Sequence, residues 1–131
     1  MFLDASAIVA MLTEEEDGDI IARRLAGCSV RYTSAIAIFE TVAAVARKNS
    51  FSVDEARAIV ARFLSLAEVT LVPVDEPVAQ AALSAFERYG KGRHPASLNM
   101  GDCFAYGCAK ALAVPLLFKG DDFTRTDIDA A

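Results

Sequence analysis

Short apolar segments alternate with helix-forming segments along the chain, and this alternation restricts the folds open to it. Runs of β-branched, aromatic or aliphatic residues predict strands at residues 2–4, 29–33, 69–74 and 114–118. Apolar residues at helical spacing predict helices at residues 5–12, 16–26, 35–47, 52–67, 75–88 and 102–112. Strands joined by helices pair in parallel, with helices on both faces. We therefore predict an α/β fold, a three-layer α/β/α domain with a central parallel sheet.

A chain of 131 residues fits one domain, so we expect a single domain over residues 1–131 with one site. The first residues lack a basic segment followed by an apolar stretch, and no apolar run approaches the roughly 18 residues that span a bilayer. A cytoplasmic location is expected. Cys28, Cys103 and Cys108 contain no C-x-x-C pair, and His94 is the single histidine, so neither disulfides nor a zinc site is supported. The cysteines are expected to be small core residues.

Carboxylates from four separate segments are predicted to meet at one edge of the sheet. In a parallel α/β sheet the carboxyl ends of the strands gather along a single edge, where ligands bind. Asp4 ends the first strand, Glu40 lies in the second turn of a helix that follows a strand, Asp102 starts a helix, and Asp121 and Asp122 follow the last strand. The acidic run at residues 14–19 is instead expected to be a solvated, non-catalytic loop.

Each acid also has a structural explanation when it is taken singly. Asp4 and Asp102 could be helix N-caps, and Asp121 and Asp122 could be turn residues. Glu40 is harder to explain, because its helical neighbours are Ile36, Ala37, Ala43 and Ala44, and a buried carboxylate is costly unless it is paired or bound to metal. The alternative to a metal ion is an ion pair between Glu40 and Arg47, which lies two turns away.

Carboxylates without histidine or cysteine are the ligands of a hard cation, so the joint pattern favours Mg²⁺ or Mn²⁺. The formal net charge of −5 argues against nucleic-acid binding by bulk electrostatics alone. An anionic substrate would therefore need such a cation before it could approach the acids.

Several motifs resemble those of PIN-domain ribonucleases of the VapC toxin group, and the likeness extends from end to end. It is carried by residues 2–7, 34–40 and 89–96 and by two more specific motifs, Leu98-Asn99-Met100-Gly101-Asp102-Cys103 and Leu117-Phe118-Lys119-Gly120-Asp121-Asp122-Phe123. The resemblance implies RNA hydrolysis that depends on Mg²⁺ or Mn²⁺ and leaves a 3′-hydroxyl and a 5′-phosphate. It also implies a cognate antitoxin that covers the active edge.

By this resemblance the catalytic and metal-binding quartet falls on Asp4, Glu40, Asp102 and Asp122. Asp121, beside Asp122, leaves the fourth position open between the two. Ser6 would direct its hydroxyl toward Asp4 or a metal-bound water, or else serve the start of the helix. Asp127 would support the site or have a structural role.

The most basic local segment contains Arg88, Lys91 and Arg93, which either contact RNA phosphates or form a solvated loop. His94 is expected to be a structural loop residue, and a metal-free mechanism with two histidines is excluded because the second is absent. The alanine-rich helices suit either a homodimer or an internal core.

Two other functions stay open. An aspartyl-phosphate phosphatase would use Asp4 as its nucleophile, but Ala5-Ser6-Ala7 follows instead of a second acid two residues on. A non-catalytic binding module would keep the acids for the fold, and would bind metal without cleaving RNA.

Overall fold

The computed structural model describes residues 1–131 and contains a four-stranded, fully parallel sheet with the strand order β3-β2-β1-β4. The strands are β1 (Phe2–Leu3), β2 (Arg31–Ser34), β3 (Val69–Val72) and β4 (Leu116–Leu117). Phe2 pairs with Tyr32 on one side and with Leu116 on the other. β1 is therefore a central strand, and both of its neighbours end next to Asp4.

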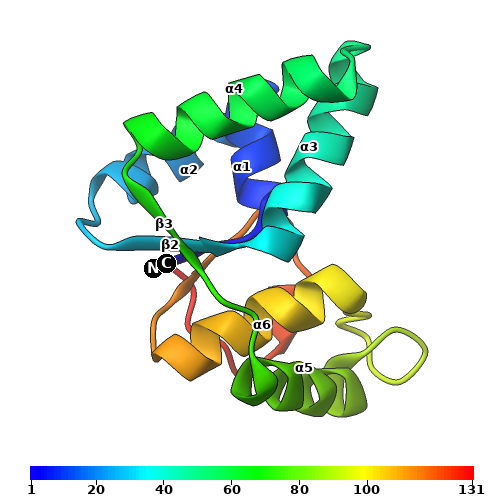
Figure 1. Cartoon of the computed structure of the whole chain (residues 1–131). Helices are drawn as coiled ribbons and strands as arrows, with labels where there is room; N and C mark the ends of the chain where they lie inside the picture. Colours follow the sequence, from blue (N-terminus) through cyan, green and yellow to red (C-terminus); the bar gives the residue numbers. More distant parts are fainter.

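Helices cover both faces of this sheet (Figure 1). On one face lie α1 (Ala5–Leu12), α2 (Gly18–Ala26), α3 (Ala35–Asn49) and α4 (Val53–Leu66). On the other face lie α5 (Glu76–Tyr89) and α6 (Met100–Leu112), and a short 3₁₀ helix, η1 (Phe123–Arg125), follows β4. The predicted three-layer α/β/α fold with a parallel sheet is confirmed. None of the helices has the length and apolar character needed to cross a membrane.

Alternate residues of the central strands build the two cores. Phe2 and Leu116 pack with α5 and α6, whereas Leu3 and Leu117 pack with α1 and α2. All four side chains are fully buried, as expected for a sheet with helices on both faces. A third cluster, formed by Val45, Ala56 and Val60, joins α3 to α4. The strand ends are thus held between two packed layers.

The helices α5 and α6 approach each other closely at Gly107. A β-carbon at this position would lie 2.7 Å from the Val78 carbonyl oxygen and 3.0 Å from the Ala82 backbone nitrogen. Both atoms belong to the backbone of α5, which cannot move aside as a flexible side chain can. Glycine at position 107 therefore allows the contact that places α6, and Asp102 with it.

Two predicted helix starts are wrong by two residues. We expected a helix from residue 16, but α2 begins at Gly18. We expected Asp102 to start a helix, but α6 begins at Met100, because Asn99 is its N-cap and Asp102 completes a capping box as the third helical residue. Of the cysteines, Cys103 and Cys108 are buried as expected, whereas Cys28 is only partly buried.

Candidate active site at the carboxyl edge of the sheet

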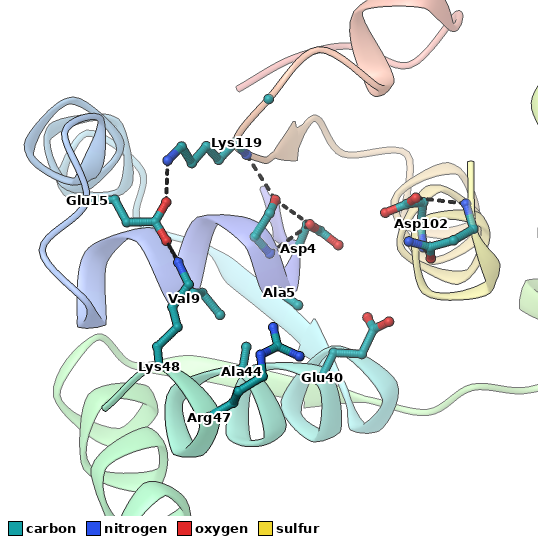
Figure 2. A pocket seen from close by; sticks show the side chains of 13 residues that line it. Asp4, Ala5, Val9, Glu15, Glu40, Ala44, Arg47, Lys48, Asp102 and Lys119 are labelled. Atoms are coloured by element: carbon teal, nitrogen blue, oxygen red, sulfur yellow. Dashed lines mark hydrogen bonds and ion pairs between the residues drawn. The ribbon is translucent and has the colours of Figure 1, made fainter. Parts of the chain in front are cut away.

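A cleft of about 480 Å³ opens at the carboxyl edge of the sheet and is lined by three of the predicted acids (Figure 2). Asp4 follows β1, Glu40 comes from α3, and Asp102 comes from the first turn of α6. The other polar residues of its lining are Ser6, Glu15, Arg47, Lys48, Asn99 and Lys119. Topology thus brings together carboxylates that are distant in sequence.

Asp4 is the N-cap of α1 and only 3% exposed. Its Oδ2 accepts hydrogen bonds from the Ser6 backbone N–H at 2.9 Å and from the Ser6 hydroxyl at 2.5 Å. The Ser6 Oγ in turn accepts a hydrogen bond from the Lys119 backbone N–H at 3.0 Å. Burial raises the pKa of Asp4 above its usual value, although the bonds from Ser6 oppose this shift. Ser6 therefore orients Asp4, as one of its two predicted roles required.

Glu40 is partly buried and lies against the N-terminal turn of α6. A β-carbon at Gly101 would overlap the Glu40 carboxylate, so glycine leaves room for this side chain beside α6. Burial, together with the negative charges of Asp4 and Asp102, raises the pKa of Glu40 to about 7. The alternative partner Arg47 lines the same cleft but forms no ion pair with Glu40.

Asp102 has a capping role and also faces the cleft. Its Oδ2 accepts a hydrogen bond from the Asn99 backbone N–H at 2.8 Å. Burial raises the pKa of Asp102 to about 6; the bond from Asn99 opposes this, and the charges of Asp4 and Asp122 add to it. A capping function and a place in the acid cluster are therefore compatible.

Asp122 lies close enough for its charge to reach the cluster, although it is exposed and is not part of the cleft lining. Its charge raises the pKa of both Asp4 and Asp102. No such effect comes from Asp121, whose backbone carbonyl accepts hydrogen bonds from the Thr124 amide at 3.1 Å and hydroxyl at 2.6 Å. The electrostatics therefore favour Asp122 over Asp121 as the fourth acid.

The donor set fits a hard divalent cation. Asp4, Glu40, Asp102 and Asp122 have no lysine, arginine or histidine partner, and carboxylate oxygens are the ligands that Mg²⁺ and Mn²⁺ prefer. No three of these side chains are close enough here to bind one ion together. Mg²⁺ usually keeps several water ligands and needs only one or two protein carboxylates, so the set fits without three direct contacts.

The repulsion among these acids predicts that the metal-free protein loses stability as pH rises. Glu40 has a pKa of about 7 in the folded protein, whereas the ordinary pKa of a glutamate side chain is 4.5. Between these values the unfolded chain releases its proton first, so unfolding becomes more favourable as pH rises. The pKa of Asp102 is raised from 3.8 to about 6, so Asp102 also makes unfolding more favourable as pH rises. We expect the thermal midpoint measured in EDTA to decrease as the pH is raised from about 5 to about 7.

Thermal unfolding at pH 5, 6, 7 and 8, with EDTA or with Mg²⁺, measures this effect. Mg²⁺ should restore the midpoint most at pH 8, and Glu40→Gln should flatten the EDTA profile. A midpoint that is independent of pH in EDTA and insensitive to Mg²⁺ would contradict the assigned cluster.

The prediction that the acidic run at residues 14–19 is a solvated loop is wrong for Glu15 alone, because the other acids of the run are exposed. Glu15 lines the cleft and forms ion pairs with Lys48 and Lys119, which lower the pKa of Glu15 to about 2. Sequence reasoning missed this group because its members are 33 and 104 residues from Glu15. Local patterns carry no signal for such a distant pairing.

The remaining candidates lie outside the cleft lining. Asp127 accepts a hydrogen bond from the Tyr106 hydroxyl at 2.6 Å and pairs with Arg88 at 3.3 Å, so it has the structural role that was one of its two alternatives. Arg88 is thereby engaged, and its guanidinium also lies 4.7 Å from the centre of the Tyr89 ring. His94 accepts a hydrogen bond from the Ala96 backbone N–H through Nδ1 at 3.1 Å, as a structural loop histidine would.

Lys91 and Arg93 are exposed in the loop that precedes α6. This loop lies at the same end of the molecule as the N-terminus of α6, which carries Asp102 (Figure 1). Arg93 stacks on Phe86, with its guanidinium carbon 5.0 Å from the ring centre. Contact of these two cations with RNA stays a prediction.

Comparisons with known proteins agree with this architecture. A family model described as "PIN domain" matches residues 1–129. The protein named ribonuclease VapC of Mycolicibacterium smegmatis is 44% identical over 130 residues, which cover 99% of this chain and 98% of the relative. Ribonuclease VapC30 of Mycobacterium tuberculosis is 42% identical over 128 residues, covering 98% and 95%.

A solved structure has the same fold. Mycobacterium tuberculosis VapC20, described as a Sarcin-Ricin loop cleaving toxin, matches with a TM-score of 0.76 over 99% of this chain and 97% of its own. At 16% identity this match supports the fold alone.

Proposed function

This chain belongs to the PIN-domain family of VapC ribonucleases, and from that premise we propose that it is the toxin of a type II toxin–antitoxin module. It hydrolyses RNA phosphodiester bonds with the help of Mg²⁺ or Mn²⁺. The observation that carries this proposal is the cluster of Asp4, Glu40 and Asp102 in one cleft, with no cationic side chain paired to any of them. Partly buried carboxylates without a cationic partner are costly, and a bound divalent ion would offset that cost.

Asp4, Asp102 and Asp122 would hold the ion, in part through its water ligands, and Glu40 would either join them or position the attacking water. When bound, the ion lowers the pKa of a coordinated water and offsets negative charge on the phosphate. Ser6 keeps Asp4 oriented through its hydroxyl. If it does not join the ligands, Glu40, which lines the cleft beside Asp4 and Asp102, would accept the proton from the water.

Cleavage should depend completely on the divalent ion. The purified chain, incubated with end-labelled single-stranded and structured RNA, should cut in Mg²⁺ or Mn²⁺ and stop in EDTA, because carboxylates without a bound ion repel the phosphate and do not lower the pKa of the attacking water. Analysis of the product ends should find 3′-hydroxyl and 5′-phosphate groups. Cleavage that persists in EDTA would refute the metal mechanism. Metal binding by folded protein without any cleavage would favour a binding module instead, and covalent labelling of Asp4 by a phosphate donor would favour the phosphatase.

We also infer that the antitoxin covers the cleft and places a basic side chain among the acids. Phe39 is 74% exposed and Met100 is 68% exposed, and they lie next to Glu40 and close to Asp102 in the chain. Large apolar side chains that are exposed beside a charged cleft are typical of a protein interface. The cytoplasmic location remains a prediction.

A homodimer remains a second prediction about partners. A groove of about 390 Å³ between α5 and α6 is lined only by apolar residues, which include Leu83, Phe86 and Met100. Leu83 is 62% exposed in the single chain. Sedimentation velocity should give the mass of two chains, and the mass of one chain would contradict the dimer.

A further inference from the structure

Glu15 joins two lysines from distant elements at the rim of the acid cleft. Lys48 comes from the C-terminal turn of α3 and contacts Oε1 of Glu15, whereas Lys119 follows β4 and contacts Oε2. Figure 2 shows Glu15 between the two ammonium groups, on the side of the cleft away from Asp102. Each oxygen of one carboxylate therefore holds one lysine.

We propose that Glu15 is a positioning residue that holds Lys48 and Lys119 as a phosphate-binding pair for the RNA strand entering the cleft. This inference rests on the proposed ribonuclease function. The pair would contact phosphates that flank the scissile bond, while the acids on the other side hold the metal.

The lysines keep free hydrogen-bonding capacity. An ammonium group has three donors, and Glu15 is the only carboxylate that either lysine contacts. The side chain of Lys48 is 41% exposed and that of Lys119 is 31% exposed, whereas Glu15 is more buried, at 19%. Both lysine side chains are therefore partly open to solvent, while Glu15 lies behind them as an anchor.

The backbone of Lys119 places this pair relative to the acids. Its N–H donates to the Ser6 Oγ at 3.0 Å, and the Ser6 hydroxyl donates to Asp4. The side chain of the same residue reaches Glu15. One residue thus links the proposed phosphate-binding pair to the acid at the end of β1.

An unpaired cation in the same cleft extends the positive rim. Arg47 lines the cleft next to Lys48 and forms no ion pair, and it points into the cleft between Glu40 and Lys48 (Figure 2). Because the chain carries a formal net charge of −5, RNA needs local cations of this kind to approach the acids.

The lysines can be tested by the salt dependence of RNA binding. Binding of a fluorescein-labelled, 12-nucleotide single-stranded RNA is measured by anisotropy in Mg²⁺, from 50 to 300 mM KCl, with every variant made on the Asp4→Asn background so that the RNA is not cleaved. Lys48→Gln and Lys119→Gln should each weaken binding by about 3- to 10-fold and reduce the slope of log affinity against log salt by about 0.7, the loss of one phosphate contact to a single strand. Arg57→Gln is the charge-matched control, because Arg57 is exposed on α4 and pairs only with Asp54.

Glu15→Gln separates a positioning role of Glu15 from a purely electrostatic one, because the two predict opposite changes in RNA affinity. Removal of a negative charge should strengthen RNA binding by bulk electrostatics, as Glu16→Gln should do slightly, since Glu16 is exposed and unpaired. If Glu15 positions the lysines, Glu15→Gln should instead weaken binding and raise KM more than it lowers kcat. Thermal midpoints establish that each variant is folded.

Tighter binding by Glu15→Gln, or salt slopes for both lysine variants equal to that of their Asp4→Asn parent, would overturn the inference and leave Glu15 as a structural clamp. Absence of RNA binding in Mg²⁺ by the chain that carries only Asp4→Asn would overturn it too. Failure of the proposed function has a different signature, because the wild-type chain would then show no metal-dependent cleavage whatever the lysine variants do.

Discussion

Asp4→Asn should lose roughly a thousandfold in RNA cleavage while the protein stays folded. Asparagine has nearly the same shape and is an equally good N-cap, so it can still accept the hydrogen bond from the Ser6 backbone N–H that caps α1. It removes the negative charge that would bind the ion. Asp4 is almost fully buried, and burial raises its pKa. The neutral side chain should therefore leave the thermal midpoint in EDTA unchanged or higher.

Initial cleavage rates and thermal unfolding of the same preparations measure both effects. Asp121→Asn is the matched control, because Asp121 lies beside the cluster but contributes no charge effect to Asp4 or Asp102. It should retain near-wild-type cleavage, whereas Asp122→Asn should lose most of it. Cleavage by Asp4→Asn would contradict the assigned site. If Asp121→Asn were inactive and Asp122→Asn active, Asp121 would be the fourth acid instead of Asp122.

Gly107→Val should destabilise the protein by about 3 kcal/mol, because the new side chain meets the backbone of α5 rather than a movable side chain. A β-carbon at this position already lies 2.7 Å from the Val78 carbonyl oxygen. Substitution of a helical glycine should otherwise be favourable by a few tenths of a kcal/mol, so the predicted sign opposes helix propensity. For a domain of this size the thermal midpoint should fall by about 10 °C.

Differential scanning calorimetry measures this loss. Ala111→Val provides the comparison, because it places the same β-branched side chain at an exposed position of the same helix. It should cost only about 0.5 kcal/mol. If Gly107→Val and Ala111→Val unfold within about 2 °C of each other, the close contact between α5 and α6 does not limit stability.

Local sequence patterns were sufficient for most elements of the fold. Helix α1 has its predicted bounds, and α4 lies within one residue of its predicted bounds at each end, where Ser52 and Glu55 form a capping box at its start. The predicted start of α6 at Asp102 is two residues late, because the N-cap of this helix is Asn99. Both residues are common near helix starts, and the choice between them depends on the path of the preceding loop.

Placement of the candidate acids followed from topology rather than from any local pattern. A parallel sheet gathers the ends of its strands at one edge, so Asp4, Glu40 and Asp102 could be assigned to one region before their contacts were known. The structure brings these three together in the cleft.

By itself, the sequence determined the order of the elements, the parallel α/β class, most helix boundaries and the edge where the acids meet, because periodicity and capping act over a few residues. Only the tertiary structure decided the pairing of Glu15 with Lys48 and Lys119, the absence of a partner for Glu40, and the raised pKa values of Glu40 and Asp102. These properties depend on burial and on charges brought close by packing, to which residues far apart in the chain contribute together.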